Sequence, residues 1–206
     1  MWTFCYYRKQ WLRLIVILSF FLKIKPSWRV FTLISEGISS GTLVTWNPMV
    51  ANFRPFVTCA SILLSRHVNG FDQIIHILNV YSPCRERKRF WDGLKRAGFL
   101  QVPNLILVGD PNLTLFPSEM WGAGPADDEL ADYFISLFND MHLNNIVPAV
   151  LSPTWLNMCC GGREISKRLD RFVTKDLLWE EICKYRSWSQ ATSFYDHRVV
   201  PSAGLW

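Results

Sequence analysis

Residues 104–112 have the sequence NLILVGDPN, in which an unbroken apolar run leads into a glycine, an aspartate, a proline and an asparagine. A short apolar run bounded by turn residues predicts a fully buried strand, here residues 104–108. A second apolar run, residues 74–81 (IIHILNVY), stops at Ser82-Pro83 and predicts another strand. Together these strands indicate a layered fold built around a sheet.

The segments around these two strands alternate between strand-like and helix-like patterns. Further strands are predicted over residues 41–46, 58–64 and 165–173, and amphipathic helices over residues 86–100 and 127–141. The acidic start of the second helix suits the positive end of a helix dipole. No repeat, low-complexity tract or Gly/Ser-rich linker divides the chain. The pattern therefore predicts one domain of mixed α/β class.

The composition is that of a globular protein with reduced cysteines. Of the 206 residues, 50% are hydrophobic and 19% are charged, which excludes a disordered chain. The net charge of +5 slightly favours polyanionic partners, but the basic residues are spread along the sequence, so an evenly basic surface is the alternative. The six cysteines include no C-x-x-C pair and no zinc-ligand spacing. We expect an intracellular protein, with the nucleus as one compartment open to it, and infer no specific protein partner.

Residues 1–27 differ from the rest of the chain. Basic residues precede an apolar run, residues 14–22, which is closed by Lys23. The run is much shorter than the ~20 residues of a membrane-spanning helix, and no small-residue cleavage site follows it. We therefore do not expect a membrane partner. Residues 1–27 form an atypical apolar segment in front of a domain that spans residues 28–206.

Polar side chains follow the predicted strands. Asp110 and Asn112 are two positions apart, and on an extended segment such residues point to the same side. A carboxylate and a carboxamide placed in this way can hold a phosphate, a hydrolytic water or a hard cation such as Mg²⁺. The alternative is an ordinary Asp-Pro-Asn turn with a solvated aspartate.

Two further polar clusters occur later in the sequence. Asp170 lies between Arg168 and Arg171, and Asp196 precedes His197. An aspartate between two arginines is usually part of a surface ion pair. If Asp170 instead reaches the imidazole of His197, it would fix the tautomer, as an orienting carboxylate does for a catalytic histidine.

Five motifs occur in a fixed order along the chain. They are Asn79-Val80-Tyr81-Ser82-Pro83, Gly109-Asp110-Pro111-Asn112, Thr154-Trp155, Arg168-Leu169-Asp170-Arg171-Phe172 and Asp196-His197. This ordered set resembles the endonuclease/exonuclease/phosphatase superfamily, which is deoxyribonuclease-I-like. Further segments resemble its plant non-LTR retrotransposon branch: Val44-Thr45-Trp46-Asn47, residues 84–91 (CRERKRFW) and Thr154-Trp155-Leu156-Asn157. The resemblance covers about residues 28–197.

The resemblance implies a two-sheet α/β sandwich that cleaves phosphodiester bonds of DNA with Mg²⁺ as cofactor. Carried over to this sequence, Asp110 would deprotonate the attacking water or protonate the leaving oxygen. Asn112 would orient Asp110 and hydrogen-bond the phosphate, and Tyr81 would contact the phosphate. Such chemistry needs in-line positioning, charge neutralisation and fixed donors around the phosphate.

The same resemblance assigns the later motifs. His197 would bind a phosphoryl oxygen with Asp170 hydrogen-bonded to its far nitrogen, and Asp196 would face the metal. The expected contacts with nucleic acid are Trp155, Arg168 and Arg171. Aromatic rings stack on bases or wedge beside them, although core packing is the alternative for Trp155.

The sequence departs from the family at its front end. Family members begin with a strand that carries an asparagine, and a second strand ends in Q-E-T, whose glutamate is the principal metal ligand. Neither motif precedes Trp28. We therefore expect an N-terminally truncated domain that lacks the first strands and in which Mg²⁺ binding is weakened or lost.

Three functions remain open at this point. The first is an impaired endonuclease, the second a non-catalytic remnant that binds nucleic acid, and the third a phosphatase of the same superfamily. The remnant would use a set of basic residues, namely Arg85, Arg87, Lys88, Arg89, Lys167, Arg168 and Arg171.

Overall fold

The computed structural model describes residues 6–7, 23, 25–34, 41–58, 61–67, 72–124, 127–157, 164–176 and 178. A six-stranded sheet with the strand order β4-β5-β6-β7-β12-β9 forms its centre. The strands are β4 (Arg54–Val57), β5 (Ser61–His67), β6 (Ile74–Tyr81), β7 (Leu105–Asp110), β9 (Leu143–Asn145) and β12 (Arg171–Lys175). β6 and β7 run parallel, and all other neighbours in this sheet run antiparallel.

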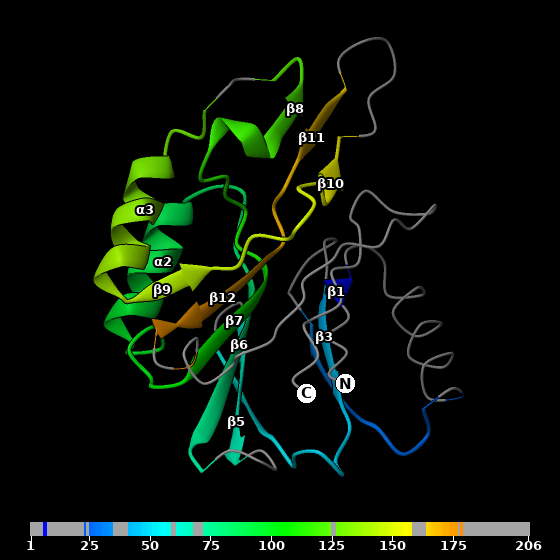
Figure 1. Cartoon of the computed structure of the whole chain (residues 1–206). Coiled ribbons are helices and arrows are strands. Elements are labelled where there is room, and N and C mark those ends of the chain that lie inside the picture. Colours follow the sequence, from blue (N-terminus) through cyan, green and yellow to red (C-terminus); the bar gives the residue numbers. More distant parts are fainter. Residues whose placement is uncertain are drawn as a thin grey trace.

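The two faces of this sheet are covered by different layers (Figure 1). Helices α2 (Arg87–Arg96) and α3 (Ala131–Asp140) lie on one face. On the other face lies a three-stranded sheet of β1 (Tyr6–Tyr7), β3 (Gly41–Trp46) and β2 (Arg29–Ile34). A second small sheet joins β10 (Trp155–Leu156), β11 (Ile165–Lys167) and β8 (Met120–Gly122), and a 3-10 turn, Pro117–Glu119, precedes β8. The architecture is a two-sheet α/β sandwich, as predicted.

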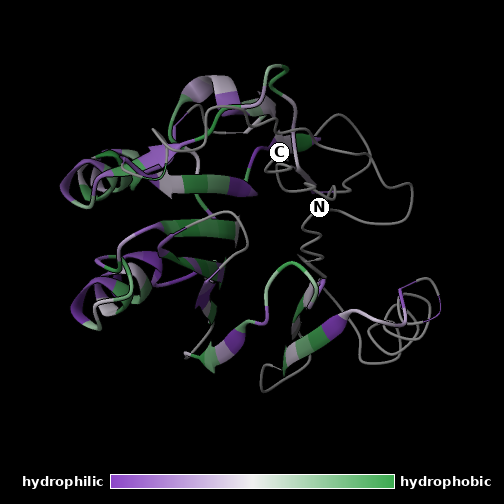
Figure 2. Cartoon of the chain, turned by 60° about the horizontal axis from the view of Figure 1, so that its bottom comes forward, coloured by the Kyte–Doolittle hydropathy of each residue, from purple (hydrophilic) through white to green (hydrophobic). Residues whose placement is uncertain are grey.

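The side chains of β7 show why its sequence is apolar without interruption. Leu105 and Leu107 pack in the cluster beneath the helices, whereas Ile106 and Val108 pack in the cluster between the two sheets. Successive side chains of a strand point to opposite faces, so a strand covered on both faces needs apolar residues at every position. Figure 2 shows this hydrophobic colouring in the central strands, while both colours alternate along the helices. The predicted buried strand is confirmed, and it continues to Asp110.

The helix layer is held by an aromatic cluster. Trp91 of α2 is fully buried, with its ring centroid 5.7 Å from that of Phe134 and 6.4 Å from that of Phe138, both on α3. Edge-to-face pairs at such distances stabilise beyond the area that they bury. α2 ends before the predicted boundary because Gly98 adopts a φ of 81° and the Phe99 N–H donates to the Leu94 carbonyl.

The prediction of one strand over residues 165–173 was wrong. β11 belongs to the small sheet with β8 and β10, whereas β12 belongs to the central sheet. Between them the chain leaves both ladders, because the N–H groups of Leu169 and Asp170 donate to Thr154 Oγ1, each at 2.9 Å. The chain therefore crosses from one sheet to the other at Asp170.

The start of the second helix also differs from the prediction. α3 begins at Ala131, so Asp127, Asp128 and Glu129 precede the helix. Asp128 instead accepts the backbone N–H of Leu130 at 3.0 Å and holds a distant arginine. Asp128 therefore lies in front of the helix and forms a tertiary ion pair there.

Residues 1–27 are described only in part. β1 pairs with Gly41 and Thr42 of β3 and so extends the smaller sheet. The apolar run over residues 14–22 lies outside the described residues. Within the described part of the chain, no helix combines the length and the hydropathy that crossing a membrane requires.

Candidate active site

Three neighbouring strands bring Tyr81, Asp110 and Asp170 to one edge of the central sheet. Tyr81 and Asp110 are the last residues of the parallel strands β6 and β7 and are partners in their register. β12 runs antiparallel to β7, and its first residue, Arg171, is the partner of Gly109. Asp170 therefore enters the sheet beside Asp110. The structure thus brings together one predicted site residue from each of three motifs.

The loop after β7 is a tight turn. The Asn112 N–H donates to Asp110 Oδ1 at 2.7 Å, and Asn112 Nδ2 donates to the Ser82 carbonyl at 2.6 Å. Ser82 in turn donates its N–H to the Asp110 carbonyl at 2.9 Å. Asn112 has a φ of 53°, so residues 110–112 form the turn that was predicted as the alternative to an extended segment, but Asp110 is buried in this turn and not solvated. The turn nevertheless keeps Asp110, Asn112 and the end of β6 within hydrogen-bonding distance of one another.

Thr154 fixes the approach of Asp170. Its hydroxyl oxygen accepts the N–H groups of both Leu169 and Asp170, and its own N–H donates to the Lys167 carbonyl at 2.9 Å. The side chain of Trp155, the next residue, is half-buried on β10. Asp110 and Asp170 are both buried, with exposed fractions of 0% and 7%. Thr154 therefore has a structural role, which is to orient the Arg-Leu-Asp segment.

Arg168 and Arg171 are buried, which contradicts their prediction as nucleic-acid contacts. Their exposed fractions are 3% and 2%. Arg168 Nη1 lies 2.6 Å from Glu119 Oε1, Arg171 Nη1 donates to the same oxygen at 2.8 Å, and Arg171 Nη2 pairs with Glu119 Oε2. A buried cation requires a partner of opposite charge, and both arginines find it in one carboxylate. Neither guanidinium is placed to reach a nucleic acid.

The electrostatics of this cluster favour an ionised carboxylate. Burial raises the pKa of the Glu119 carboxyl group, but the hydrogen bond and charge of Arg171 outweigh it, so the pKa of Glu119 lies below its ordinary value. Burial and the neighbouring Arg171 cation lower the pKa of Arg168. Glu119 is the residue that sequence reasoning missed. The sequence carried no clear signal for it, because residues 165–171 are rich in charged side chains and Glu119 is 49 positions from Arg168.

A second ion pair braces the loop after β7 from the helix side. Arg87, at the start of α2, donates to both carboxylate oxygens of Asp128 at 2.6 and 2.9 Å and to the Asn112 carbonyl at 2.8 Å. Asp128 Oδ2 also accepts the Thr114 N–H at 3.2 Å. Arg87 was expected on a basic surface of the remnant, but its side chain is only 14% exposed. The pair instead ties both helices to the site loop.

Replacing Asp128 with asparagine is expected to make stability less sensitive to acid. Burial raises the pKa of this carboxyl group, but the Arg87 hydrogen bond and the backbone donors outweigh it, so the folded-state pKa lies below 3.8. A depressed pKa contributes stability above the unfolded-state value, and this contribution is lost as the pH falls through the folded-state pKa. When urea unfolding is measured from neutral pH down to below pH 3.8, the free energy of unfolding should therefore fall less steeply for Asp128→Asn than for the wild type. Asp140→Asn is the control, because Asp140 is exposed. Equal slopes for Asp128→Asn and the wild type would contradict the expectation.

The described residues do not by themselves fit a Mg²⁺ site. No three His, Cys, Asp or Glu side chains among them lie close enough together to hold a metal ion. The predicted metal residue Asp196 and the predicted catalytic residue His197 lie outside the described residues.

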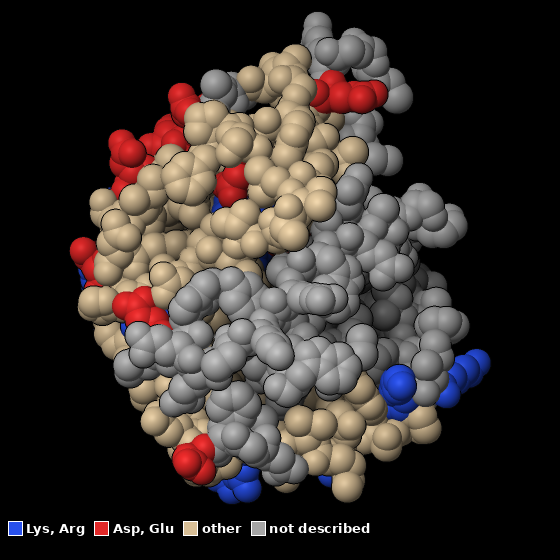
Figure 3. Space-filling view, in the orientation of Figure 1, with Lys and Arg blue, Asp and Glu red and all other residues tan. Residues whose placement is uncertain are grey.

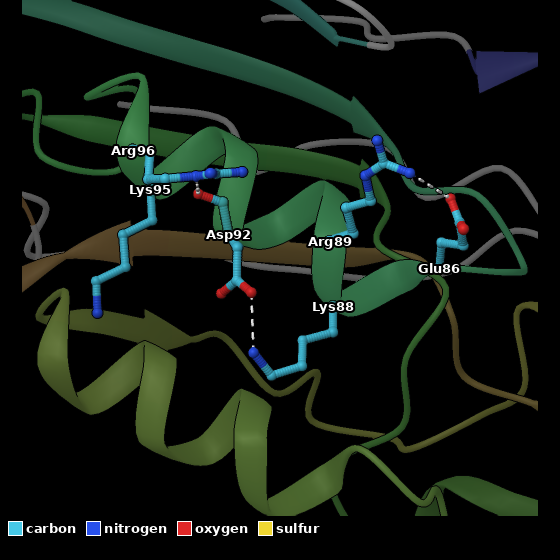
Figure 4. A pocket seen from close by; sticks show the side chains of 6 residues that line it. All are labelled: Glu86, Lys88, Arg89, Asp92, Lys95 and Arg96. Carbon is cyan, nitrogen blue, oxygen red and sulfur yellow. Dashed lines mark hydrogen bonds and ion pairs between the residues drawn. The ribbon is translucent and has the colours of Figure 1, made fainter.

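A shallow hollow on the outer side of α2 is separate from the sheet edge formed by Tyr81, Asp110 and Asp170. Its lining residues are Glu86, Lys88, Arg89, Asp92, Lys95 and Arg96 (Figure 4). Four of these residues are basic and two are acidic, and each acidic residue pairs with a basic one: Lys88 Nζ lies 2.9 Å from Asp92 Oδ2 and Arg89 Nη1 lies 3.4 Å from Glu86 Oε2. On the face shown in Figure 3, acidic side chains gather along the flank near the helices and the basic ones lie mainly at the lower edge. Among the described residues, that face therefore shows no large cluster of basic side chains.

Comparison with known proteins identifies the fold. No family model matches the chain, and no curated protein matches it in sequence. The chain is similar to the solved endonuclease domain of TRAS1, a telomere-specific non-LTR retrotransposon, at 16% identity and a TM-score of 0.67 over 91% of each chain. It is similar to the 3′ phosphatase NExo from Neisseria bound to a product DNA hairpin, at 14% identity and a TM-score of 0.64 over 88% of this chain and 80% of that one. It is also similar to an AP endonuclease from Archaeoglobus fulgidus, at 15% identity and a TM-score of 0.59 over 88% and 80% of the two chains. The chain therefore has the deoxyribonuclease-I-like sandwich of the endonuclease/exonuclease/phosphatase proteins.

Proposed function

We propose that the chain is an endonuclease-like domain of plant retrotransposon origin that binds DNA phosphate at the edge formed by Tyr81, Asp110 and Asp170. The observation that supports it is the placement of these residues on adjacent strands, with register pairs at Tyr81–Asp110 and Gly109–Arg171. The likeness to a retrotransposon endonuclease domain over 91% of each chain supports a retrotransposon origin, whereas the plant branch rests on the sequence motifs alone. Structures of this fold include one with a bound single-stranded DNA product.

In the proposed reaction, each polar group has one task. Asp110 accepts a proton from the attacking water as the water oxygen bonds to phosphorus and the bond from phosphorus to the leaving oxygen breaks, and the proton then passes to that leaving oxygen. Asn112, held by the turn after β7, orients the Asp110 carboxylate and hydrogen-bonds the phosphate. Tyr81 contacts the phosphate from the neighbouring strand. Asp170 would orient His197 toward a phosphoryl oxygen, and Asp196 would be a ligand of Mg²⁺. When bound, the cation would neutralise charge on the phosphodiester.

We further propose that hydrolysis by residues 1–206 is slow. The family glutamate that ligates the metal has no counterpart before Trp28 in this sequence. Mg²⁺ is usually held by only one or two carboxylates, so the loss of one weakens both affinity and geometry. Trp155, which lies on β10 of the second small sheet, would contact the DNA.

The test is a plasmid-nicking assay with Mg²⁺ and with EDTA. We expect slow nicking that EDTA abolishes and that Asp110→Ala and His197→Ala lower by about 100-fold, because a positioned acid–base group typically contributes that much. Asp140→Ala, an exposed carboxylate on α3, is the matched control and should nick like the wild type. Nicking that neither Asp110→Ala nor His197→Ala reduces would contradict the proposal.

Two other outcomes would assign the alternative functions. Binding of labelled DNA without any metal-dependent nicking would identify a non-catalytic remnant. Release of inorganic phosphate from a 3′-phosphorylated DNA end, without nicking, would identify a phosphatase. The likeness to a 3′ phosphatase bound to product DNA favours this second candidate over a phosphatase of small phosphoesters.

A further inference from the structure

Glu119 holds three partners while its side chain is almost fully buried. Its exposed fraction is 2%. Oε1 accepts from Arg168 Nη1 at 2.6 Å and from Arg171 Nη1 at 2.8 Å. Oε2 accepts the Leu115 N–H at 2.7 Å and pairs with Arg171 Nη2. One carboxylate therefore connects the loop after β7 with the segment that leads into β12.

The two arginines extend this connection to further parts of the backbone. Arg171 Nη2 donates to the Leu113 carbonyl at 3.1 Å, and Arg168 Nη2 donates to the Ile146 carbonyl at 2.9 Å. The Arg168 N–H also donates to the Glu119 carbonyl at 2.9 Å. The cluster thus links four stretches of chain, namely residues 113–115, 119, 146 and 168–171. All these contacts lie away from solvent, where hydrogen bonds to charged groups are strongest.

The cluster lies directly beside the candidate site. Arg168 and Arg171 flank Asp170, and Leu113 follows Asn112 in the turn that holds Asp110. A change in the Glu119 carboxylate therefore acts on both sides of the site edge at once.

We infer that Glu119 is a positioning residue, which fixes Asp170 relative to Asp110 and Asn112 through Arg168 and Arg171. An effect of Glu119 on catalysis rests on the proposed function, whereas its effect on the relative placement of Asp170, Asp110 and Asn112 does not. Displacement of catalytic groups by about 1 Å costs up to about 100-fold in rate, so loss of this link should act on kcat.

The first arm of the test compares Glu119→Gln with Leu137→Ala in the nicking assay. Glu119→Gln keeps the size of the side chain but removes its charge. Leu137→Ala opens a cavity under α3, so it costs stability of the same order without touching the site. At a temperature below both unfolding midpoints, we expect Glu119→Gln to lower kcat at least about tenfold with KM unchanged, and Leu137→Ala to retain the wild-type kcat. Equal losses in the two variants would show that Glu119 only stabilises the fold.

The second arm is hydrogen exchange, which needs no activity. The Asn112 N–H bonds Asp110 Oδ1 and the Asp170 N–H bonds Thr154 Oγ1. We expect Glu119→Gln to lower the protection of both amides while the β5 and β6 amides keep theirs. Unchanged protection at Asn112 and Asp170 would overturn the inference, whatever the nicking result.

The two arms separate the inference from the proposed function. Lost protection in Glu119→Gln, together with a wild-type chain that does not nick, would uphold the positioning role and reject the endonuclease. If Glu119→Gln does not fold, Arg168→Gln takes its place. That variant leaves Glu119 paired with Arg171 and removes only the bonds of the Arg168 guanidinium, so a fall in kcat and in Asp170 protection is again the supporting result.

Discussion

Replacing Glu119 with alanine is expected to lower the free energy of unfolding by about 3 to 5 kcal/mol, because it leaves buried cations without their counter-charge. Arg168 and Arg171 both depend on this carboxylate, and the Leu115 N–H loses its acceptor as well. Solvent is excluded from all these groups, so water does not replace the lost partner. Urea unfolding followed by tryptophan fluorescence would measure the change.

Asp140→Ala provides the matched control for this experiment. Asp140 also pairs with a basic residue, Lys95, but both side chains are exposed, and such pairs contribute only about 0.2 to 1 kcal/mol. A second variant separates charge from packing: replacing Glu119, Arg168 and Arg171 together by apolar residues of similar volume should recover most of the lost stability. A loss below about 1 kcal/mol in Glu119→Ala would show that water or relaxation compensates the arginines.

Replacing Gly109 with alanine is expected to cost about 3 kcal/mol or more, from an unfavourable backbone conformation and from overpacking. Gly109 has a φ of 111°, and an added Cβ would lie 2.3 Å from the Val80 carbonyl oxygen and 3.0 Å from Asn79 Oδ1. The carbonyl belongs to the neighbouring strand β6 and has no freedom to move without breaking the pairing of β6 and β7. Because Asp110 is the next residue, the same strain would displace the site.

Gly98→Ala measures the cost of the unfavourable backbone conformation alone, without overpacking. Gly98 also has a positive φ, 81°, but an added Cβ there would meet nothing within 4 Å. It should cost only about 1 to 2 kcal/mol. Thermal unfolding of both variants would give the difference, and an equal loss at the two glycines would mean that the contact with Val80 relaxes without cost.

The central strands and the helices could be predicted from the sequence because local pattern and burial agree in them. β6 and β3 have the predicted bounds, and β7 needed apolar residues at every position because both of its faces are covered. Both helices are amphipathic as predicted, with Trp91 and Phe134 among their buried residues. Each of these features follows from side-chain periodicity within one segment.

The break between β11 and β12 could not be predicted, because its cause lies elsewhere in the sequence. Residues 165–173 have a continuous strand pattern, yet Thr154 takes two N–H groups out of the ladder. The placement of the acidic residues before α3 could not be predicted for the same reason, because Asp128 pairs with Arg87, which is 41 positions away in the sequence. Periodicity carries no information about such partners.

The sequence predicted which residues meet at the edge of the central sheet, but it did not predict the ion pairs that surround them. Ordered motifs placed Tyr81, Asp110 and Asp170 together, and the strand register bears this out. The fate of Arg168 and Arg171 depended on Glu119, which is 49 and 52 positions away. A sequence shows that an arginine follows an aspartate, but the arginine is buried only if a carboxylate from elsewhere in the chain pairs with it in the folded protein.

The pairing of β7 with β12 has a consequence for synthesis on the ribosome. β7 ends at Asp110, and its partner begins only at Arg171. While the intervening residues are being translated, β7 has an open hydrogen-bonding side and apolar residues on both faces, a combination that invites pairing with another nascent chain. Slower translation between these two strands should therefore increase aggregation, and chaperones that cover extended apolar segments should be needed most in that interval.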